Sequence, residues 1–249
     1  MPKLMTDDMQ VVTTPNNFQF SATRMENLEG AFTYTLVTLI VDNTGSVAGF
    51  KNELEQCIKV AIESCGSSPQ VENLMIRVAR FDSSVPEEIH GFKLFRQIDL
   101  ADYNGCLNPG GMTALYDAVF SSTEITSEFG KTLMDQDYVA NAVTFIITDG
   151  GDNCSSSTPE NIKQLIAKIK QDETYLESIT TILVGVNTVD YNLQTMLDNF
   201  KNEAELDQYI DIKDADTKSL ARLAQFISKS ISSTSQSLGT GQPSSLLTF

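Results

Sequence analysis

Thr38-Leu39-Ile40-Val41-Asp42-Asn43-Thr44-Gly45-Ser46 is the stretch that decides the fold. It ends an apolar run that begins at Phe32, and within residues 36–41 only Thr38 is polar. A run of this kind is typical of a strand buried on both faces in the middle of a parallel sheet.

Three oxygen-bearing side chains follow this strand directly. Asp42, Thr44 and Ser46 stand at every second position just past the C-terminal end of the strand. Ligands of open α/β sheets bind at that end. A carboxylate and two hydroxyls suit Mg²⁺, Mn²⁺ or Ca²⁺ better than zinc. Asp and Thr are also ordinary capping residues of turns, so this motif alone leaves a purely structural role open.

Strand and helix patterns alternate along the rest of the chain. Further strands are predicted at residues 73–81, 142–148, 179–186 and 208–212, with edge-type strands near 17–23 and at 88–98. Helices are predicted at residues 48–64, 114–129, 159–171, 190–200 and 216–231. This alternation predicts an α/β fold, Rossmann-like and doubly wound, with a mostly parallel central sheet and helices on both faces.

The pattern predicts one domain with two flanking segments. Residues 1–30 are expected to form a polar N-terminal arm, residues 31–231 the domain, and residues 232–249 a flexible tail. The tail is rich in Ser, Thr and Gly and contains no charged side chain. Its last residues, Leu246-Leu247-Thr248-Phe249, leave two interpretations open, a frayed terminus or a short docking motif.

Composition disfavours several classes of partner. The 249-residue chain carries a net charge of −16, so nucleic acid and anionic membranes are poor partners. Residues 1–8 lack the pattern of a secretory signal, and no apolar run approaches the roughly 20 residues that span a bilayer. The four cysteines are widely spaced, which indicates reduced thiols. These observations predict a cytoplasmic protein.

Two further oxygen donors follow other predicted elements. Thr113 comes after the Gly110-Gly111 turn and is expected to cap the helix that begins at residue 114. Asp149 follows the buried strand at 142–148 and opens a glycine-rich turn. In a parallel sheet the loops after these strands meet at one edge, so Asp42, Thr44, Ser46, Thr113 and Asp149 are expected to converge there.

The three motifs together resemble the von Willebrand factor A (VWA) domain family. Its metal-ion-dependent adhesion site (MIDAS) has the pattern Asp-x-Ser/Thr-x-Ser, then a distant Thr, then a distant Asp. Asp42, Thr44, Ser46, Thr113 and Asp149 match that pattern in order. The surrounding Gly-Gly-x-Thr-x-Leu and Thr-Asp-Gly-x-Asx sequences match as well, and the resemblance covers about residues 32–230.

The resemblance implies a binding module and not an enzyme. In the family, a bound divalent cation, most often Mg²⁺, accepts a Glu or Asp from a partner protein. Intracellular members work beside MoxR-type AAA+ ATPases or kinase–phosphatase sets. The alternative is a Mg²⁺-dependent phosphoryl hydrolase that uses Asp42 and Asp149 as metal ligands, although no nucleophile or general base is evident.

The sequence also predicts structural roles or positions for three other polar residues. Asp117, one helical turn after Thr113, is expected to steady the Thr113 loop. Asp152 has two interpretations, a turn residue, which we favour, or an acid that contacts the ligands of the site from behind. His90 is the only histidine and is predicted to be a surface residue of an edge strand without a role. A single histidine without a triad arrangement excludes Ser-His-Asp and Cys-His chemistry.

Overall fold

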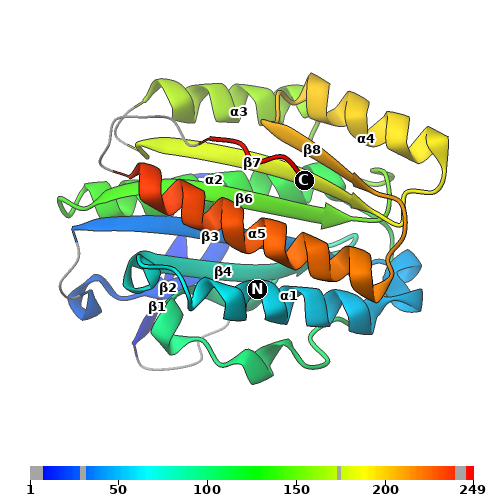
Figure 1. Cartoon of the computed structure of the whole chain (residues 1–249). Helices are drawn as coiled ribbons and strands as arrows, with labels where there is room; N and C mark the ends of the chain where they lie inside the picture. The colour runs from blue at the N-terminus through cyan, green and yellow to red at the C-terminus, as the bar shows by residue number, and fades with distance from the viewer. Residues whose placement is uncertain (1–7, 29–31, 173–174, 239–244) are drawn as a thin grey trace.

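A computed structural model describes residues 8–28, 32–172, 175–238 and 245–249. Its centre is an eight-stranded sheet in the order β1-β2-β5-β4-β3-β6-β7-β8 (Figure 1). The strands are β1 (Met9–Thr13), β2 (Gln19–Thr23), β3 (Thr33–Asp42), β4 (Leu74–Phe81), β5 (Glu87–Leu94), β6 (Val139–Thr148), β7 (Ser178–Val186) and β8 (Gln208–Ile212). The five strands from β4 to β8 in this order are mutually parallel. The predicted mixed α/β class with a mostly parallel sheet is confirmed.

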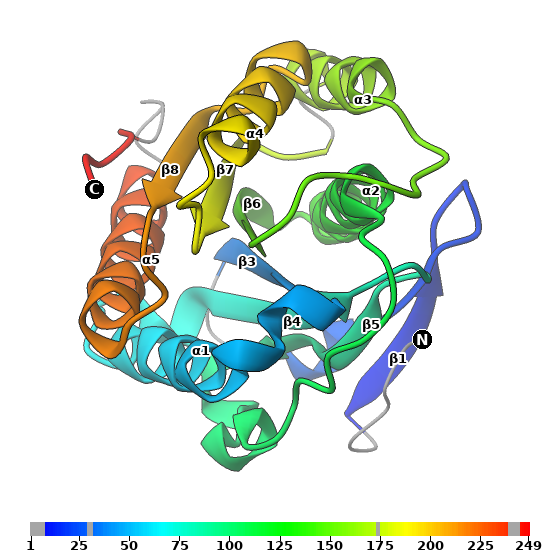
Figure 2. The same cartoon turned by 90° about the vertical axis from the view of Figure 1, so that its right-hand side faces the viewer.

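Helices cover both faces of the sheet. They are α1 (Lys51–Cys65), α2 (Leu115–Met134), α3 (Pro159–Gln171), α4 (Tyr191–Glu203) and α5 (Thr217–Ser237). Figure 2 shows α1 and α5 on one face and α2, α3 and α4 on the other. Short 3-10 turns occupy Met25–Asn27, Gly45–Gly49, Val71–Asn73, Phe95–Gln97 and Leu100–Tyr103.

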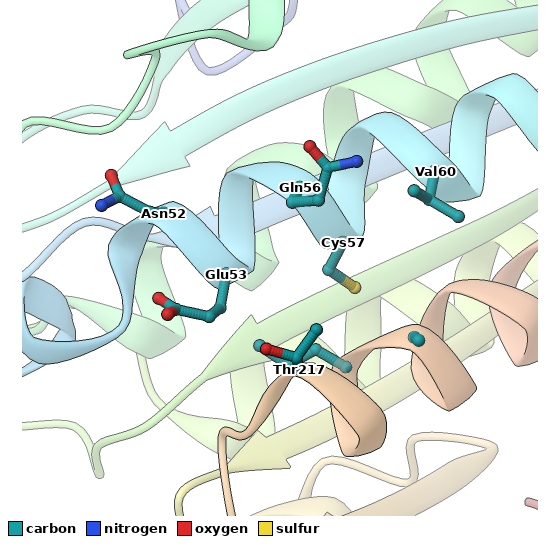
Figure 3. A pocket seen from close by; sticks show the side chains of 8 residues that line it. Asn52, Glu53, Gln56, Cys57, Val60 and Thr217 are labelled. Atoms are coloured by element: carbon teal, nitrogen blue, oxygen red, sulfur yellow. The ribbon is translucent and has the colours of Figure 1, made fainter.

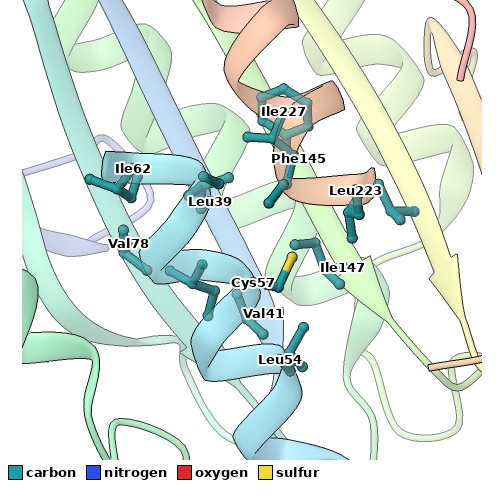
Figure 4. Packing of buried hydrophobic residues seen from close by; sticks show 14 of the residues in the cluster. Leu39, Val41, Leu54, Cys57, Ile62, Val78, Phe145, Ile147, Leu223 and Ile227 are labelled. Carbon is teal, nitrogen blue, oxygen red and sulfur yellow. The ribbon is translucent and has the colours of Figure 1, made fainter. Parts of the chain in front are cut away.

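The strand β3 is apolar from Leu36 to Val41, apart from Thr38, because both of its faces are covered. Leu39 and Val41 pack toward α1 and α5 with Phe145, Leu223 and other members of that cluster (Figure 4). Ile40 faces the other way and packs beneath α2. Successive side chains of a strand point to opposite faces, so a strand with two covered faces needs a continuous apolar run. The run therefore places the C-terminal end of β3 at the centre of one sheet edge.

A row of buried polar side chains divides the core beneath α2. Thr38 of β3 pairs in register with Arg77 of β4 and Thr144 of β6, and its hydroxyl lies 2.8 Å from that of Thr126 in α2. On one side of this row lies the cluster around Phe129, and on the other the cluster around Ile146. Four buried polar atoms of this region have no hydrogen-bond partner among the described residues: Arg77 Nη1, Ser122 Oγ, Thr123 Oγ1 and Thr144 Oγ1.

The N-terminal segment is part of the sheet, which corrects the prediction of an arm. The strand expected near 17–23 is β2, but β1 pairs antiparallel with it and β2 pairs with β5. Buried Glu88 accepts hydrogen bonds from the Ser21 amide and hydroxyl and pairs with Arg77 at 2.9 Å. A Cβ on Gly91 would lie 1.9 Å from the Ser21 carbonyl oxygen, so this close approach requires glycine. Residues 1–7 lie outside the described residues.

His90 is buried, and the prediction of a surface position is wrong. The strand β5 is antiparallel to β4, and it lies inside the sheet because β2 covers its outer side. The His90 side chain has no exposed surface, and its Nε2 lies 2.6 Å from the Tyr103 hydroxyl. Its other ring nitrogen, Nδ1, lies 2.8 Å from the Gly91 carbonyl oxygen.

The predicted C-terminal boundary is also corrected. The helix α5 extends to Ser237, six residues beyond the predicted end at residue 231. At the terminus, the ring of Phe249 packs edge-on against Phe226 with 5.6 Å between centroids. The Arg222 guanidinium lies 4.4 Å from the centroid of the same ring. The rest of the predicted tail, residues 239–244, lies outside the described residues.

Candidate functional site

Asp42 is the last residue of β3 and is fully buried. Its Oδ1 accepts a 2.8 Å hydrogen bond from the Thr44 amide. Its Oδ2 accepts a 2.6 Å hydrogen bond from the Thr148 hydroxyl. Burial raises the pKa of this carboxyl, and the bonds from Thr148 and Thr44 partly offset that rise. The neighbouring strands therefore hold Asp42 in one orientation at the sheet edge.

The turn after β3 connects Asp42 to the adjacent strand. Residues Gly45–Gly49 form a 3-10 turn, which brings Ser46 back over the sheet edge. The Ser46 hydroxyl donates a 2.7 Å hydrogen bond to Asp149 Oδ1. It also lies 3.0 Å from the Thr44 hydroxyl. Ser46 is exposed while Thr44 is buried, so the group is open on the Ser46 side.

Asp149 directly follows β6, the neighbour of β3 in the sheet. Burial raises the pKa of its carboxyl to about 6. The Ser46 hydrogen bond lowers that pKa, whereas the nearby Asp42 charge raises it. Within the described part of the chain, neither carboxylate forms an ion pair with a lysine or arginine. Two adjacent, largely buried carboxylates are thus left without a positive side chain.

Thr113 lies beside this group, but its predicted capping role is wrong. The helix α2 is capped at Ala114, and no side chain makes a capping bond there. The Thr113 amide instead donates to Asn153 Oδ1 at 2.9 Å, and the Asn153 amide donates to the Thr113 carbonyl at 3.0 Å. A Cβ on Gly150 would lie 3.5 Å from the Thr113 hydroxyl oxygen, which places that hydroxyl next to the Asp149 turn.

Asn43 holds the Thr113 loop in place, and the sequence analysis missed it. Its side-chain amide donates to the Asn108 carbonyl at 3.1 Å and accepts from the Asn108 amide at 2.7 Å. Its own carbonyl accepts from the Gly110 amide at 2.9 Å. Asn43 is 4% exposed, and a buried amide needs such partners. In the sequence, the one indication of this role is that Asn43 is a polar residue between Asp42 and Thr44.

Asp117 and Asp152 stabilise the loop after Asp149. The Asp117 carboxylate accepts hydrogen bonds from the amides of Ser156 at 2.9 Å and Ser157 at 2.7 Å. The sequence predicted that Asp117 would steady the Thr113 loop, but its carboxylate binds the loop after Asp149, so that prediction is wrong about the loop. Asp152 accepts from the Tyr116 amide at 3.2 Å, so this turn residue also contacts the first turn of α2.

The structure thus brings together all five residues that the sequence singled out. Hydrogen bonds connect Asp42, Thr44, Ser46 and Asp149, and Thr113 lies against the next residue of the Asp149 turn. The described residues contain no group of three or more His, Cys, Asp or Glu side chains placed to hold a metal ion. The oxygen set here consists of two carboxylates and three neutral hydroxyls, which is an incomplete shell for a hard cation.

A separate groove of about 340 Å³ lies between α1 and α5. Figure 3 shows Cys57 of α1 and Thr217 of α5 along this groove. Burial raises the pKa of the Cys57 thiol to about 12, so the thiol stays protonated and unreactive near neutral pH. We assign no function to this groove.

Comparisons with solved structures show a shared fold at low sequence identity. The PilB minor pilin from Streptococcus sanguinis matches with 14% identity and a TM-score of 0.56, over 91% of this chain and 67% of that one. A mutant form of the same pilin gives a TM-score of 0.59 and 13% identity over 90% and 66%. The pilus adhesin SpaC from Lactobacillus rhamnosus GG matches with 12% identity and a TM-score of 0.56 over 83% and 30%. Proximal thread matrix protein 1 from the mussel byssus matches with 17% identity and a TM-score of 0.55 over 82% and 49%.

These findings correct the sequence-based family assignment. No family model matches the chain, and no curated protein matches it. The structural neighbours are pilin and pilus adhesin structures, and no metal-binding group of His, Cys, Asp or Glu is found among the described residues. We therefore withdraw the VWA assignment and the MIDAS label. What remains is an α/β fold shared with these neighbours, each of which is longer than the present chain.

No helix in the described part of the chain is both long and apolar enough to cross a bilayer.

Proposed function

We propose that the group formed by Asp42, Thr44, Ser46, Thr113 and Asp149 binds a divalent cation, Mg²⁺ or else Mn²⁺ or Ca²⁺. Through that cation, the protein binds a carboxylate of a partner protein. One observation carries the proposal. Asp42 and Asp149 are adjacent, largely buried and connected through hydroxyl groups, yet no lysine or arginine of the described residues compensates them. Buried charges are normally paired or coordinate metals.

Charge and ligand number explain why the cation would bind a partner. The two carboxylates balance a divalent cation, and the three hydroxyls add neutral oxygen donors. Mg²⁺ favours six ligands and usually keeps several waters, so a carboxylate from outside can replace one of them. Without the cation, a chain of net charge −16 would repel that carboxylate. Binding of the partner should therefore require the metal.

The predicted absence of catalysis is part of this proposal. The alternative, a Mg²⁺-dependent phosphoryl hydrolase, would use the same two carboxylates but still lacks an evident nucleophile. A phosphate ester that is hydrolysed by the protein but not by its Asp149→Ala variant would favour the hydrolase. The ATPase and kinase–phosphatase partner classes came from the withdrawn resemblance alone and stay untested predictions, as does the cytoplasmic location.

Calorimetric titration tests the cation step. Chelator-treated protein should take up one Mg²⁺ or Mn²⁺ per chain, and the Asp42→Ala variant should lose the heat of binding. Asp135→Asn is the matched control, because it removes the same charge at an exposed position just after α2. Equal binding by wild type and Asp42→Ala, or no heat with either ion, would contradict the proposal.

A further inference from the structure

Large apolar side chains gather at the sheet edge that carries Asp42 and Asp149. Figure 2 looks onto this edge, where the parallel strands end. Eight large hydrophobic side chains are exposed in the described part of the chain, and five of them lie in loops or in the first half of α4 at this edge. These five are Val85, Met112, Val189, Tyr191 and Met196, between 46% and 77% exposed. Such clustering marks interaction surfaces, whereas scattered exposed residues do not.

The five residues form two groups, one on each side of the carboxylates. Val85 follows β4, and Met112 belongs to the loop that lies against the same connection, since a Cβ on Gly111 would be 3.1 Å from Ser83 Oγ. We call this pair the β4-side flank. Val189 and Tyr191 follow β7, and Met196 is on α4. We call these three the β7-side flank. The Asp42 and Asp149 carboxylates follow β3 and β6, the two strands in between.

Met196 connects the β7-side flank to the candidate cation site. A Cβ on Gly151 would lie 2.0 Å from the Met196 sulfur, so the Met196 side chain rests on the turn that begins with Asp149. Tyr191, one helical turn and a half earlier in α4, is 77% exposed. The apolar surface is thus continuous with the candidate cation site.

The charges around the edge restrict what can bind there. Asp82, Asp152 and Asp190 also follow β4, β6 and β7, and none forms an ion pair among the described residues. A partner that brings one carboxylate to the cation would be repelled by these acids unless it also carries positive side chains.

We propose that this edge binds an extended peptide segment of a partner protein, with the pattern apolar-x-Glu/Asp-x-apolar and Lys or Arg at the x positions. This inference rests on the proposed function and specifies its partner. The central carboxylate completes the cation shell, and the two apolar side chains contact the β4-side and β7-side flanks.

The spacing follows from strand geometry. Neighbouring strands lie about 4.8 Å apart, so β4 and β7, separated by β3 and β6, are about 14 Å apart. Each flank is then about 7 Å from the centre. In an extended peptide, side chains two residues apart point the same way and are also about 7 Å apart. The intervening side chains point away from the surface, and only long ones such as Lys and Arg can bend back to the acids at its rim.

Peptides of fixed composition test the pattern. The probe is the fluorescently labelled sequence Leu-Lys-Glu-Lys-Leu, compared with Leu-Lys-Gln-Lys-Leu, Ser-Lys-Glu-Lys-Ser and the rearranged Lys-Leu-Glu-Leu-Lys. Fluorescence anisotropy is measured with the full chain in Mg²⁺ and in chelator. In Mg²⁺, the probe should bind at least tenfold more tightly than each of the other three peptides, and chelator should abolish the difference.

Variants of the protein provide the second arm. The double variant Met112→Ser/Tyr191→Ser should lose at least tenfold in probe affinity while its Mg²⁺ titration stays unchanged. Phe32→Ser, which changes an 80% exposed ring before β3 at the opposite edge, should match wild type. The affinity could depend on Mg²⁺ and on the glutamate, yet stay the same in the rearranged peptide and in the double variant. In that case the peptide pattern is wrong and the proposed function stands. If no peptide binds below about 1 mM in Mg²⁺, the pattern is wrong whatever the cation titration shows.

Discussion

The hydroxyl of Ser46 donates a 2.7 Å hydrogen bond to the carboxylate of Asp149, although 103 residues separate them in the sequence. This hydrogen bond links the ends of β3 and β6. The Ser46 hydroxyl also contacts the hydroxyl of Thr44, and the Thr44 amide donates to Asp42. An exposed serine thereby orients a largely buried acid.

Ser46→Ala should weaken cation binding by about tenfold. The change removes one hydroxyl donor and the bond that orients Asp149, a loss of about 1.4 kcal/mol. Calorimetric titration with Mg²⁺ measures it, and Ser228→Ala, at a partly exposed position of α5, is the control. Unchanged affinity in Ser46→Ala would exclude that hydroxyl from the cation site.

Asp149→Asn should stabilise the protein in the presence of chelator, by up to about 3 kcal/mol at pH 8. Burial raises the pKa of Asp149 from its usual 3.8 to about 6, and each pH unit corresponds to about 1.4 kcal/mol. Because the folded state holds the proton more tightly, wild-type stability falls as pH rises from about 4 to 6. Urea unfolding at pH 4 and pH 8 measures the free energy of unfolding of both proteins. The extra stability of the variant should be absent at pH 4. A variant less stable than wild type at both pH values would contradict the prediction.

Two buried thiols should be unreactive in the folded protein. Burial raises the pKa of Cys57 and of Cys65 to about 12, whereas Cys106 and Cys154 are partly exposed and none of the four is in a disulfide. Iodoacetamide at pH 8 should therefore modify Cys106 and Cys154 first, as peptide mass spectrometry would show. The raised pKa of Cys57 and Cys65 also means that the stability they contribute below pH 9 is lost as the pH rises toward 12. Equal labelling of all four thiols in folded protein would refute the burial of Cys57 and Cys65.

Thr144→Val should raise the free energy of unfolding by about 1 kcal/mol. The Thr144 hydroxyl is buried without a hydrogen-bond partner among the described residues, and such a group costs about 1–3 kcal/mol. Thr38→Val, in the same row, should have the opposite effect because it breaks the 2.8 Å contact with Thr126. Urea unfolding compares the two. Destabilisation by both substitutions would mean that the Thr144 hydroxyl has a partner in solution.

The sequence predicted the parts of the fold that depend on periodicity. Residues 36–41 were expected to be buried on both faces, and the central position of β3 suits this nearly continuous apolar run. The end predicted for α2, at residue 129, was too early. The helix continues to Met134, and Gly130 is required there by packing, since a Cβ would lie 2.5 Å from Leu176. The strand β1 was missed because its exposed side chains give no apolar pattern.

For the candidate site, the parallel sheet alone was enough to bring Asp42 and Asp149 together. The position of Thr113 depends instead on hydrogen bonds between the loop backbone and the side chains of Asn43 and Asn153, which no spacing reveals. The burial of His90 depends on β2, a strand 67 or more residues away, lying across β5. The family resemblance failed for a different reason, because short motifs of Asp, Ser and Thr carry little information without a match over the whole chain.

Anomalous diffraction from crystals soaked in Mn²⁺ tests the central claim most directly. One strong peak is expected at the C-terminal ends of β3 and β6, about 2.1 Å from each oxygen of Asp42, Asp149 or the hydroxyl side chains that binds the ion directly. The same experiment on Asp149→Asn crystals should show a much weaker peak or none. A wild-type map with no peak between Asp42 and Asp149, at Mn²⁺ concentrations that label other carboxylates, would contradict the account.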